Sequence, residues 1–281
     1  MQRSVTRKSI NDYKQYLLMA EKAHATITKY INEVERLSEY LEHNALNKCA
    51  LLEYRETLAE NFSSRTVNTK LAAINGYLSF IGADEYKVHL LKVQRKAFIA
   101  ENRELSAAEY KRLVNAADAS GNDRLSLVMQ TICVTGILVA ELRHITAEAV
   151  REGRAAVRNK GKTRVILIPT ALRRLLLGYM KKAGVTTGSV FLSKNKTPLD
   201  RSTVWRRMKA LCERAGVDPR KVFPHSLRHL FARVFYSVEK DLLRLADILG
   251  HASVNTTRIY TMETGRQHMK LLERVSRVLL T

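Results

Sequence analysis

The chain has 281 residues, with 48 lysines and arginines against 27 aspartates and glutamates, a formal net charge of +21. This excess predicts a polyanionic partner, and most of it lies after residue 100. No run of about 18 apolar residues occurs and residues 1–4 do not open an apolar signal core, which excludes a membrane-spanning helix and predicts a cytoplasmic protein without a membrane partner.

In four segments of the first part of the chain, apolar residues recur with a period close to 3.6, which is typical of amphipathic helices. The predicted helices cover residues 9–23, 26–41, 47–60 and 66–81. They predict a small bundle over residues 1–82. Hydroxyl side chains at 63–66 are suited to cap the last helix, whose N-terminus favours anions, so Arg65, Asn68 and Lys70 are candidate phosphate contacts.

A second domain is predicted over residues 105–265, after a linker at 83–104 that lacks periodicity and carries mixed charge. Ser106 and Glu109 have the spacing of a capping box and open its first helix. The other predicted elements are two strands, 154–159 and 164–168, around the tight turn 160–162, and helices over 202–215, 226–236 and 242–249. The fold class is therefore mainly α with one small β-hairpin.

The basic domain has few ways to act on a phosphodiester. Metal ions held by carboxylates, a P-loop, or a covalent nucleophile among cations are the usual arrangements. The domain has no P-loop sequence and no prominent acidic pair, and the three cysteines lack zinc-ligand spacing, so no metal or other cofactor is expected. Tyr260 with His225, Arg228 and His251 fits the third arrangement, although each residue singly is well explained by packing or helix capping.

Five segments of the second domain carry a resemblance to a known family. They are residues 135–142, the hairpin around Lys160, and residues 225–232, 249–251 and 257–260. On these segments the domain resembles the catalytic domain of the tyrosine recombinases, in particular the Xer-like integrases of bacteria and their mobile elements. The N-terminal bundle is similar, less specifically, to the core-binding domain of that family at residues 26–30 and 64–70.

The resemblance implies a role for each matching residue. Tyr260 is expected to attack the scissile phosphate, which forms a 3′-phosphotyrosyl bond and frees a 5′-hydroxyl without ATP or metal. Arg228 is expected to hold a nonbridging oxygen with its planar guanidinium. His225 and His251 are expected to hydrogen-bond the phosphate and assist proton movement.

Basic residues around the hairpin and elsewhere are implied to meet the DNA. Lys160 is expected to protonate the leaving oxygen, with Lys162 as its nearest competitor, because the turn is one residue shorter than the common form. Arg206 and Arg207 are equally explained as a solvated helix face. The implied DNA contacts are Lys162, Arg164, Arg206, Arg207, Thr26, Lys29, Arg65, Thr66, Asn68 and Lys70.

The implied partners are double-stranded DNA and further copies of the chain. The implied location is the bacterial nucleoid. Relatives join four subunits around two duplexes, so a tetramer on DNA is expected, and a second recombinase is a further candidate partner. Residues 266–281 form an amphipathic stripe that predicts a helix. That helix is expected to pack on its own domain or to dock in a neighbouring protomer.

One departure from the family pattern bears on activity. The family carries a phosphate-binding arginine where this chain has Leu138, and Arg143, 140° further round a regular helix, is expected to face elsewhere. Loss of one such donor typically lowers the rate by about 10² to 10³. We therefore expect impaired cleavage with DNA binding retained. The leucine is explained either by a deliberate substitution or by natural loss of activity in a homologue. The alternative is an inactive, sequence-specific DNA-binding accessory protein of the same fold.

Overall fold

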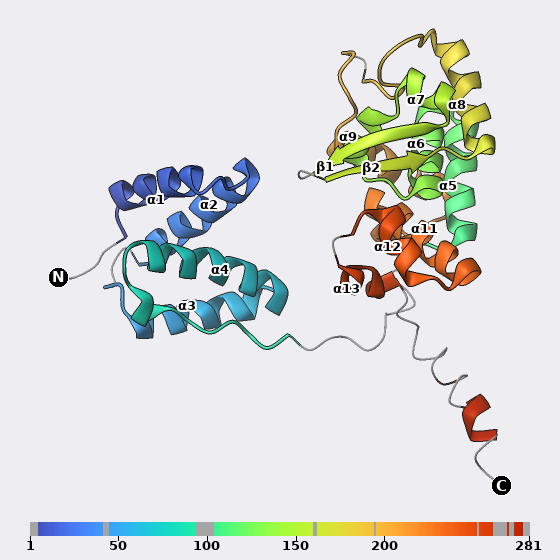
Figure 1. Cartoon of the computed structure of the whole chain (residues 1–281). Helices are drawn as coiled ribbons and strands as arrows, with labels where there is room; N and C mark the ends of the chain where they lie inside the picture. Colours follow the sequence, from blue (N-terminus) through green and yellow to red (C-terminus); the bar gives the residue numbers. More distant parts are fainter. Residues whose placement is uncertain are drawn as a thin grey trace. The chain divides into compact units, whose positions relative to one another are not determined.

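Helices make up most of the two units into which the chain divides, Met1–Arg95 and Lys96–Thr281 (Figure 1). The computed structural model describes residues 5–41, 45–93, 104–159, 162–193, 195–251, 253–260, 269 and 273–277, without the side chains of 158, 159, 162 and 259. In this part of the chain the one sheet has two antiparallel strands. The mainly helical fold class with a small β-hairpin is confirmed.

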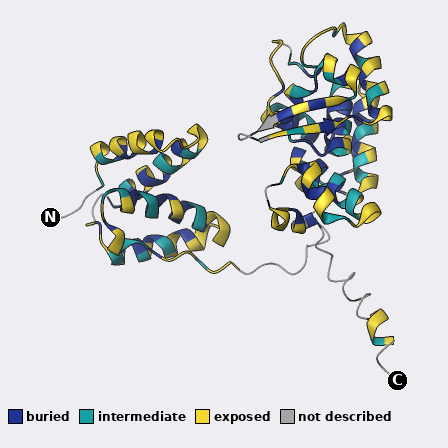
Figure 2. Ribbon diagram, viewed as in Figure 1, coloured by how far each residue is buried: buried dark blue, intermediate teal, exposed yellow. Residues whose placement is uncertain are grey.

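Four helices build the N-terminal unit. They are α1 (Arg7–Met19), α2 (His24–Tyr40), α3 (Lys48–Asn61) and α4 (Ser64–Phe80). The helices turn buried faces toward one another (Figure 2). The core between them contains Leu37, Leu71 and Ile74, each at most 1% exposed. The Ser63 hydroxyl accepts a hydrogen bond from the first turn of α4, as predicted. The four predicted helices are confirmed, with ends shifted by a few residues.

The chain that follows α4 stays with the bundle. After the 3-10 helix η1 (Asp84–Tyr86), the Asn75 amide exchanges hydrogen bonds of 2.9 and 3.1 Å with the backbone of Val88, which is 3% exposed. The segment predicted as a linker from residue 83 therefore belongs in part to the bundle. Its extended backbone is held by asparagine side chains of α4, an arrangement that leaves no periodic signal in the sequence.

The C-terminal unit is built around a central helix. Its helices are α5 (Ala107–Ala119), α6 (Asp123–Thr135), α7 (Ala147–Glu152), α8 (Thr170–Ala183), α9 (Arg201–Ala210), α10 (Cys212–Ala215), α11 (Pro224–Glu239), α12 (Leu242–Leu249), α13 (Val254–Thr257), η3 (Val139–His144), η4 (Pro219–Lys221) and η5 (Arg258–Tyr260). α6 packs against α5, α8, α9 and α11, and its Val128, Met129 and Ile132 are fully buried. The single helix predicted over 202–215 is two helices, α9 and α10.

The predicted hairpin is confirmed. β1 (Arg154–Asn159) pairs with β2 (Lys162–Leu167), with Asn159 opposite Lys162. Along β2, Ile166 is buried while Val165 and Leu167 are exposed, because successive side chains of a strand point to opposite faces. The sheet thus covers the core with one face. Residues 160 and 161, which connect the strands, lie outside the described residues.

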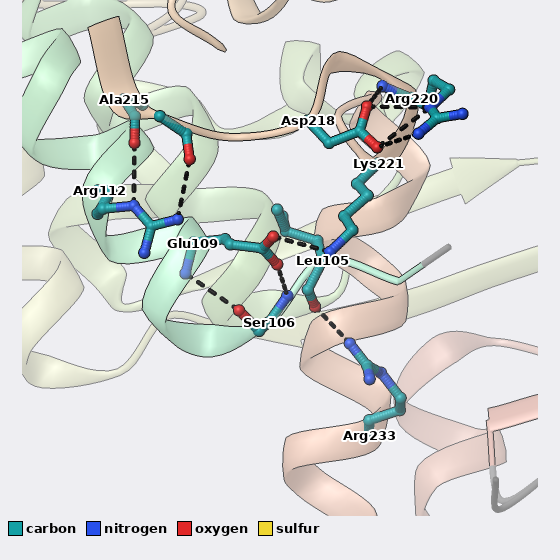
Figure 3. Close-up of polar contacts among 10 residues, drawn as sticks. Leu105, Ser106, Glu109, Arg112, Ala215, Asp218, Arg220, Lys221 and Arg233 are labelled. Carbon is teal, nitrogen blue, oxygen red and sulfur yellow. Dashed lines mark hydrogen bonds and ion pairs between the residues drawn. The ribbon is translucent and has the colours of Figure 1, made fainter. Parts of the chain in front are cut away.

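Polar contacts fix the start of α5 against the C-terminal helices (Figure 3). Ser106 and Glu109 cap the helix reciprocally, as their spacing predicts. The Glu109 carboxylate also pairs with Lys221 at 2.9 Å, and Arg112 donates from Nε to the Ala215 carbonyl at 2.9 Å. These contacts tie the first helix of the unit to α10 and η4.

The entry of the chain into the C-terminal unit is held by α11. Arg233 of this helix donates a hydrogen bond to the Leu105 carbonyl (Figure 3). It also pairs with Glu104 at 2.6 Å. Leu105 is itself 1% exposed. The first described residues of the unit are therefore anchored to a helix far along the chain.

The C-terminal tail is largely outside the described residues. Residues 273–277 are helical, and residue 269 also has helical geometry. The prediction that residues 266–281 form a docking helix therefore stays a prediction.

Replacing Gly136 with alanine is expected to destabilise the C-terminal unit by about 2 to 4 kcal/mol. Gly136 ends α6 at φ +67, and a Cβ there would lie 2.6 Å from the Phe231 ring. Urea unfolding followed by fluorescence of Trp205, the sole tryptophan, measures the change. Gly121→Ala is the control, since Gly121 has φ +65 but open space at its Cβ. Equal losses in both variants would contradict the packing argument.

Candidate active site around Arg228 and Tyr260

Three segments bring the candidate residues together. α11 opens with a proline, which suits the first helical position, and carries His225, Arg228 and His229 at spacings of three and four residues. α12 ends at Gly250, whose left-handed conformation, φ +68, turns the chain into His251. η5 follows shortly afterwards and packs on α11. Residues that are distant in sequence thus share one region of the unit.

The Arg228 guanidinium forms the centre of the site and is 3% exposed. Nη1 donates to the Gly136 carbonyl at 2.7 Å, while Nη2 donates to the Leu249 carbonyl at 2.8 Å and lies 3.0 Å from His251 Nε2. The Nε–H is buried and has no acceptor among the described residues. Burial lowers the pKa of Arg228, and the nearby Tyr260 opposes the shift. The group stays cationic at neutral pH and retains a donor for an anionic oxygen.

The Tyr260 ring packs between two imidazoles and is 5% exposed. The His229 ring meets it edge-on, with centroids 4.8 Å apart at 87°, and the His251 ring lies nearly parallel at 6.0 Å and 18°. Tyr260 also belongs to an apolar cluster with Leu245 and Leu249 of α12. The structure therefore brings the phenol, the guanidinium and one predicted imidazole into a single cluster.

The histidines His251 and His229 of this cluster, and His225 beside it, are neutral near pH 7. Burial and then Arg228 lower the pKa of His251 to about 4, and burial and then His225 lower the pKa of His229 to about 4. The His225 ring is exposed at the start of α11, 5.0 Å from the His229 ring, and partial desolvation and then Arg228 lower its pKa. Each neutral ring offers one hydrogen-bond donor and one acceptor.

The free energy of unfolding of the C-terminal unit is expected to fall as the pH drops from 6.5 to about 4. In this window the unfolded chain binds protons at His229 and His251 that the folded unit does not, so the loss reaches a few kcal/mol, roughly. Above pH 6.5 the folded and unfolded states bind equal numbers of protons at these histidines, so the free energy of unfolding no longer depends on them. Urea unfolding, followed by Trp205 fluorescence at about pH 7 and about pH 5, measures it.

His229→Gln tests the source of this pH dependence. The variant removes one of the two buried imidazoles, so its free energy of unfolding should change less between the two pH values. His89→Gln, at an exposed histidine of the other unit, should change nothing. The same pH dependence in His229→Gln as in the parent chain would rule out His229 as a source.

A buried carboxylate links Leu138 to a second guanidinium. Glu141 is 3% exposed, and its Oε2 accepts hydrogen bonds from the Leu138 backbone N–H at 2.8 Å and from Arg164 Nη2 at 2.7 Å. Arg164 also donates to the Ile248 carbonyl and packs under Gly250, where a Cβ would lie 2.7 Å from its Cδ. Arg164, predicted as a DNA contact, therefore holds β2, η3 and the turn before His251 together.

The prediction for Arg143 assumed the wrong helix type. Leu138 is half-buried and extended, and the residues after it form the 3-10 helix η3, in which each residue advances by about 120°. The Arg143 side chain is exposed, with its Nε 3.3 Å from His144 Nε2. The Arg143 side chain thus points to solvent, but the angle of about 140° calculated for an α-helix does not apply to this 3-10 helix.

The two lysines of the hairpin are not placed by the structure. Lys160 lies outside the described residues, and Lys162 is described only as a backbone position of β2. The assignment of a general acid to Lys160, with Lys162 as competitor, therefore stays a prediction.

Two predicted phosphate contacts of the bundle have structural partners instead. Lys70 is 6% exposed, and its ammonium pairs with Glu33 at 2.6 Å. The Asn68 amide exchanges hydrogen bonds of 2.7 and 2.9 Å with the backbone of Leu91. Breaking a buried ion pair costs about 3 to 5 kcal/mol, so Lys70 is held in the core. In the free chain both side chains hold the bundle together, and their contact with phosphate stays a prediction.

The other predicted contacts remain accessible. Lys29, Arg65 and Thr66 are exposed on the bundle, where Thr26 is half-buried, and on α9 Arg206 is exposed and Arg207 half-buried.

Sequence reasoning missed three residues of the cluster: Glu141, His229 and Thr257. Each lies within a motif that the resemblance quoted, Glu141 in 135–142, His229 next to Arg228, and Thr257 three residues before the tyrosine. The fully buried Thr257 places its Oγ1 2.8 Å from His251 Nδ1. Position in a motif was therefore the available signal.

Two arrangements are absent from the described ranges. There, no three or more His, Cys, Asp or Glu side chains are grouped as metal ligands. Nor does any helix of that part of the chain have the length and apolarity needed to cross a membrane.

Family models match both units. The phage integrase family matches residues 103–266, and the N-terminal SAM-like domain of phage integrases matches residues 10–85. The chain is similar to tyrosine recombinase XerA of Pyrococcus furiosus, at 28% identity over 98% of this chain and 96% of that protein. It is also similar to tyrosine recombinase XerD of Vibrio cholerae, at 30% identity over 85% of this chain and 86% of that protein.

Solved structures share the fold. A lambda integrase dimer bound to a COC' core site matches 92% of this chain and 77% of its own, with 18% identity and a TM-score of 0.74. XerH bound to its difH substrate before cleavage matches 84% of this chain and 76% of its own, with 22% identity and a TM-score of 0.66. With the family model covering more than half of its length, this chain belongs to the phage integrase family of tyrosine recombinases.

Proposed function

We propose that this chain is a site-specific DNA recombinase that cuts and rejoins duplex DNA through a 3′-phosphotyrosine at Tyr260. The observation that carries the proposal is the buried Arg228 guanidinium beside the Tyr260 and His251 rings, with an Nε–H that no described acceptor engages. A fixed guanidinium suits a phosphate because its N–H groups match the oxygens of the anion. A phosphate held there meets the phenol as its nucleophile.

In the proposed reaction, the Tyr260 oxygen bonds to phosphorus while the bond from phosphorus to the 5′ oxygen breaks. The phenolic proton leaves to a base, for which the neutral His251 and His225 are the candidates, and the 5′ oxygen takes up a proton from Lys160 or Lys162. A 5′-hydroxyl of another strand then attacks the phosphotyrosine and releases the phenol. The number of phosphodiester bonds is unchanged, so neither ATP nor a metal is needed.

Cleavage is proposed to be slow in this chain because Leu138 stands where the family has an arginine. A leucine donates no hydrogen bond to the phosphate. Arg164, whose guanidinium shares the Glu141 carboxylate with residue 138, is engaged by that carboxylate and by the Ile248 carbonyl. One missing donor accounts for about 3 to 4 kcal/mol of the activation barrier.

The proposed partners are duplex DNA and further copies of the chain. A net charge of +21 favours a polyanion. Relatives of the same fold are described on DNA, as a lambda integrase tetramer bound to a Holliday junction and as XerH bound to difH. We propose a tetramer on DNA, in which residues 266–281 join protomers. The proposed contacts with the DNA backbone are Lys29, Arg65, Thr66 and Arg206.

Leu138 also supports a second candidate function, a DNA-binding accessory protein of the same fold that does not cleave. The two candidates predict the same DNA binding and differ only in turnover. Covalent adduct formation is therefore the property that separates them.

The test starts from a binding site selected by the full chain from a random duplex library. The selected duplex, nicked near its centre so that cleavage becomes irreversible, is incubated with the chain with and without chelator. A complex that survives detergent, with phosphate on Tyr260 by mass spectrometry and a free 5′-hydroxyl, supports the recombinase. Selective DNA binding without any adduct favours the accessory protein, and the absence of selective binding overturns both.

A further inference from the structure

Both nitrogens of the His251 ring have a partner, and the partners differ in kind. Nε2 lies 3.0 Å from Arg228 Nη2, and Nδ1 lies 2.8 Å from Thr257 Oγ1. A guanidinium has donors only, so Nε2 must accept that hydrogen bond. In the neutral ring the proton then sits on Nδ1 and is donated to the Thr257 hydroxyl oxygen.

Thr257 is well placed to hold the ring. It is fully buried at the end of the short helix α13, which packs on α12, the helix that leads into His251. Its β-branched side chain has restricted rotation. Other charged or ring groups around the imidazole are Arg228 on α11, Arg164 on β2, His225 and the Tyr260 ring, and none of them is an anion. The Thr257 hydroxyl is therefore the partner that can either accept from the ring or donate to it.

We propose that Thr257 is a positioning residue that fixes the orientation of the His251 ring, so that the group facing Nε2 decides which nitrogen carries the proton. In the free protein the Thr257 oxygen accepts from Nδ1–H. When an anionic oxygen replaces the guanidinium at Nε2, the hydroxyl reverses and donates to Nδ1, so that Nε2–H, its proton exchanged through water, faces the anion. In this state His225 is the remaining candidate base for the phenolic proton. This second state rests on the proposed function, whereas the first is a property of the free chain.

The free-protein arm of the test is nitrogen NMR of the full chain labelled with ¹⁵N-histidine, with the His251 signals assigned through His251→Gln. The parent chain should show one neutral form, with the proton on Nδ1. Thr257→Ser keeps the hydroxyl and should show the same form. Thr257→Val keeps the shape and leaves Nδ1–H without its acceptor, so the ring is no longer fixed with Nε2 against Arg228 and the preference for that form should fall by about tenfold.

Thr256→Val is the matched control, one residue earlier, because Thr256 is exposed. It should leave the His251 signals unchanged. Thr257→Ala replaces the valine variant if Trp205 fluorescence shows that the valine variant is unfolded. A proton that stays on Nδ1 with the same preference in the variant without a hydroxyl would overturn the proposal, and so would a serine variant that behaves like valine.

The DNA arm separates this proposal from the proposed function. On the nicked duplex, the adduct rate should fall about tenfold in Thr257→Val and return in Thr257→Ser. If neither the parent chain nor any variant forms an adduct, the recombinase proposal fails. The NMR result then still decides the role of Thr257 in the free protein. If the parent chain forms the adduct and Thr257→Val forms it equally fast, the reversal of the hydroxyl is wrong.

Discussion

Replacing Tyr260 with phenylalanine is expected to abolish the covalent protein–DNA adduct completely. The substitution removes one oxygen, the atom that would bond to phosphorus, and leaves the ring between His229 and His251. Because most of the packing of this 5% exposed side chain comes from the ring, the free energy of unfolding should change by about 1 kcal/mol or less. Denaturing gel electrophoresis on the nicked duplex measures the adduct, and binding to the selected site should persist.

Tyr236→Phe is the matched control for this experiment. Tyr236 lies on α11 and packs against the same apolar cluster, but no described contact joins it to Arg228 or His251. Its loss of a hydroxyl should leave the adduct rate unchanged. An adduct that survives in Tyr260→Phe would show that another residue is the nucleophile and would overturn the assignment of this site.

Replacing Leu138 with arginine is expected to raise the rate of adduct formation by about 10² to 10³. Residue 138 is half-buried, and its N–H is held by the Glu141 carboxylate, next to the Arg164 guanidinium. A guanidinium at this position would add a second fork of donors beside Arg228, whose own fork is largely engaged by backbone carbonyls. Affinity for DNA should change much less, with a salt dependence steeper by about one ion.

Two variants at the same position separate charge from shape. Leu138→Met keeps an apolar side chain of similar volume and should leave the rate unchanged. Leu138→Lys adds the charge without the planar fork and should give a smaller gain than arginine. If arginine is no faster than methionine, residue 138 is not the position of the missing donor. If neither form makes any adduct, the accessory function is the better account.

The helices and the hairpin were predictable because their signals are local. Periodicity marked the four helices of the bundle, and the turn with its flanking alternation marked β1 and β2. The part of the boundary segment in which Asn75 holds the backbone of Val88 was missed, because its order comes from a side chain of another element. Local patterns therefore predicted the helices and strands well, and the side-chain contacts between elements poorly.

For the candidate site, the order of motifs led to Tyr260, Arg228 and His251, which the structure brings together. The predicted position of Lys70 near the start of a helix could not reveal Glu33, which lies 37 residues earlier and pairs with its buried ammonium. The angle assigned to Arg143 depended on a helix type that sequence does not fix. Pairings between distant side chains decide these cases, and they exist only in the folded chain.

The anchoring of the chain's entry has a mechanical consequence. Arg233, which clamps Glu104 and Leu105, lies five residues after Arg228 on α11, about 7.5 Å along the helix axis. A helix of this length is stiff, so the residue that holds Glu104 and Leu105 and the residue that carries the guanidinium move together. The first described residues of the C-terminal unit and the anion-binding guanidinium are thereby attached to one helix.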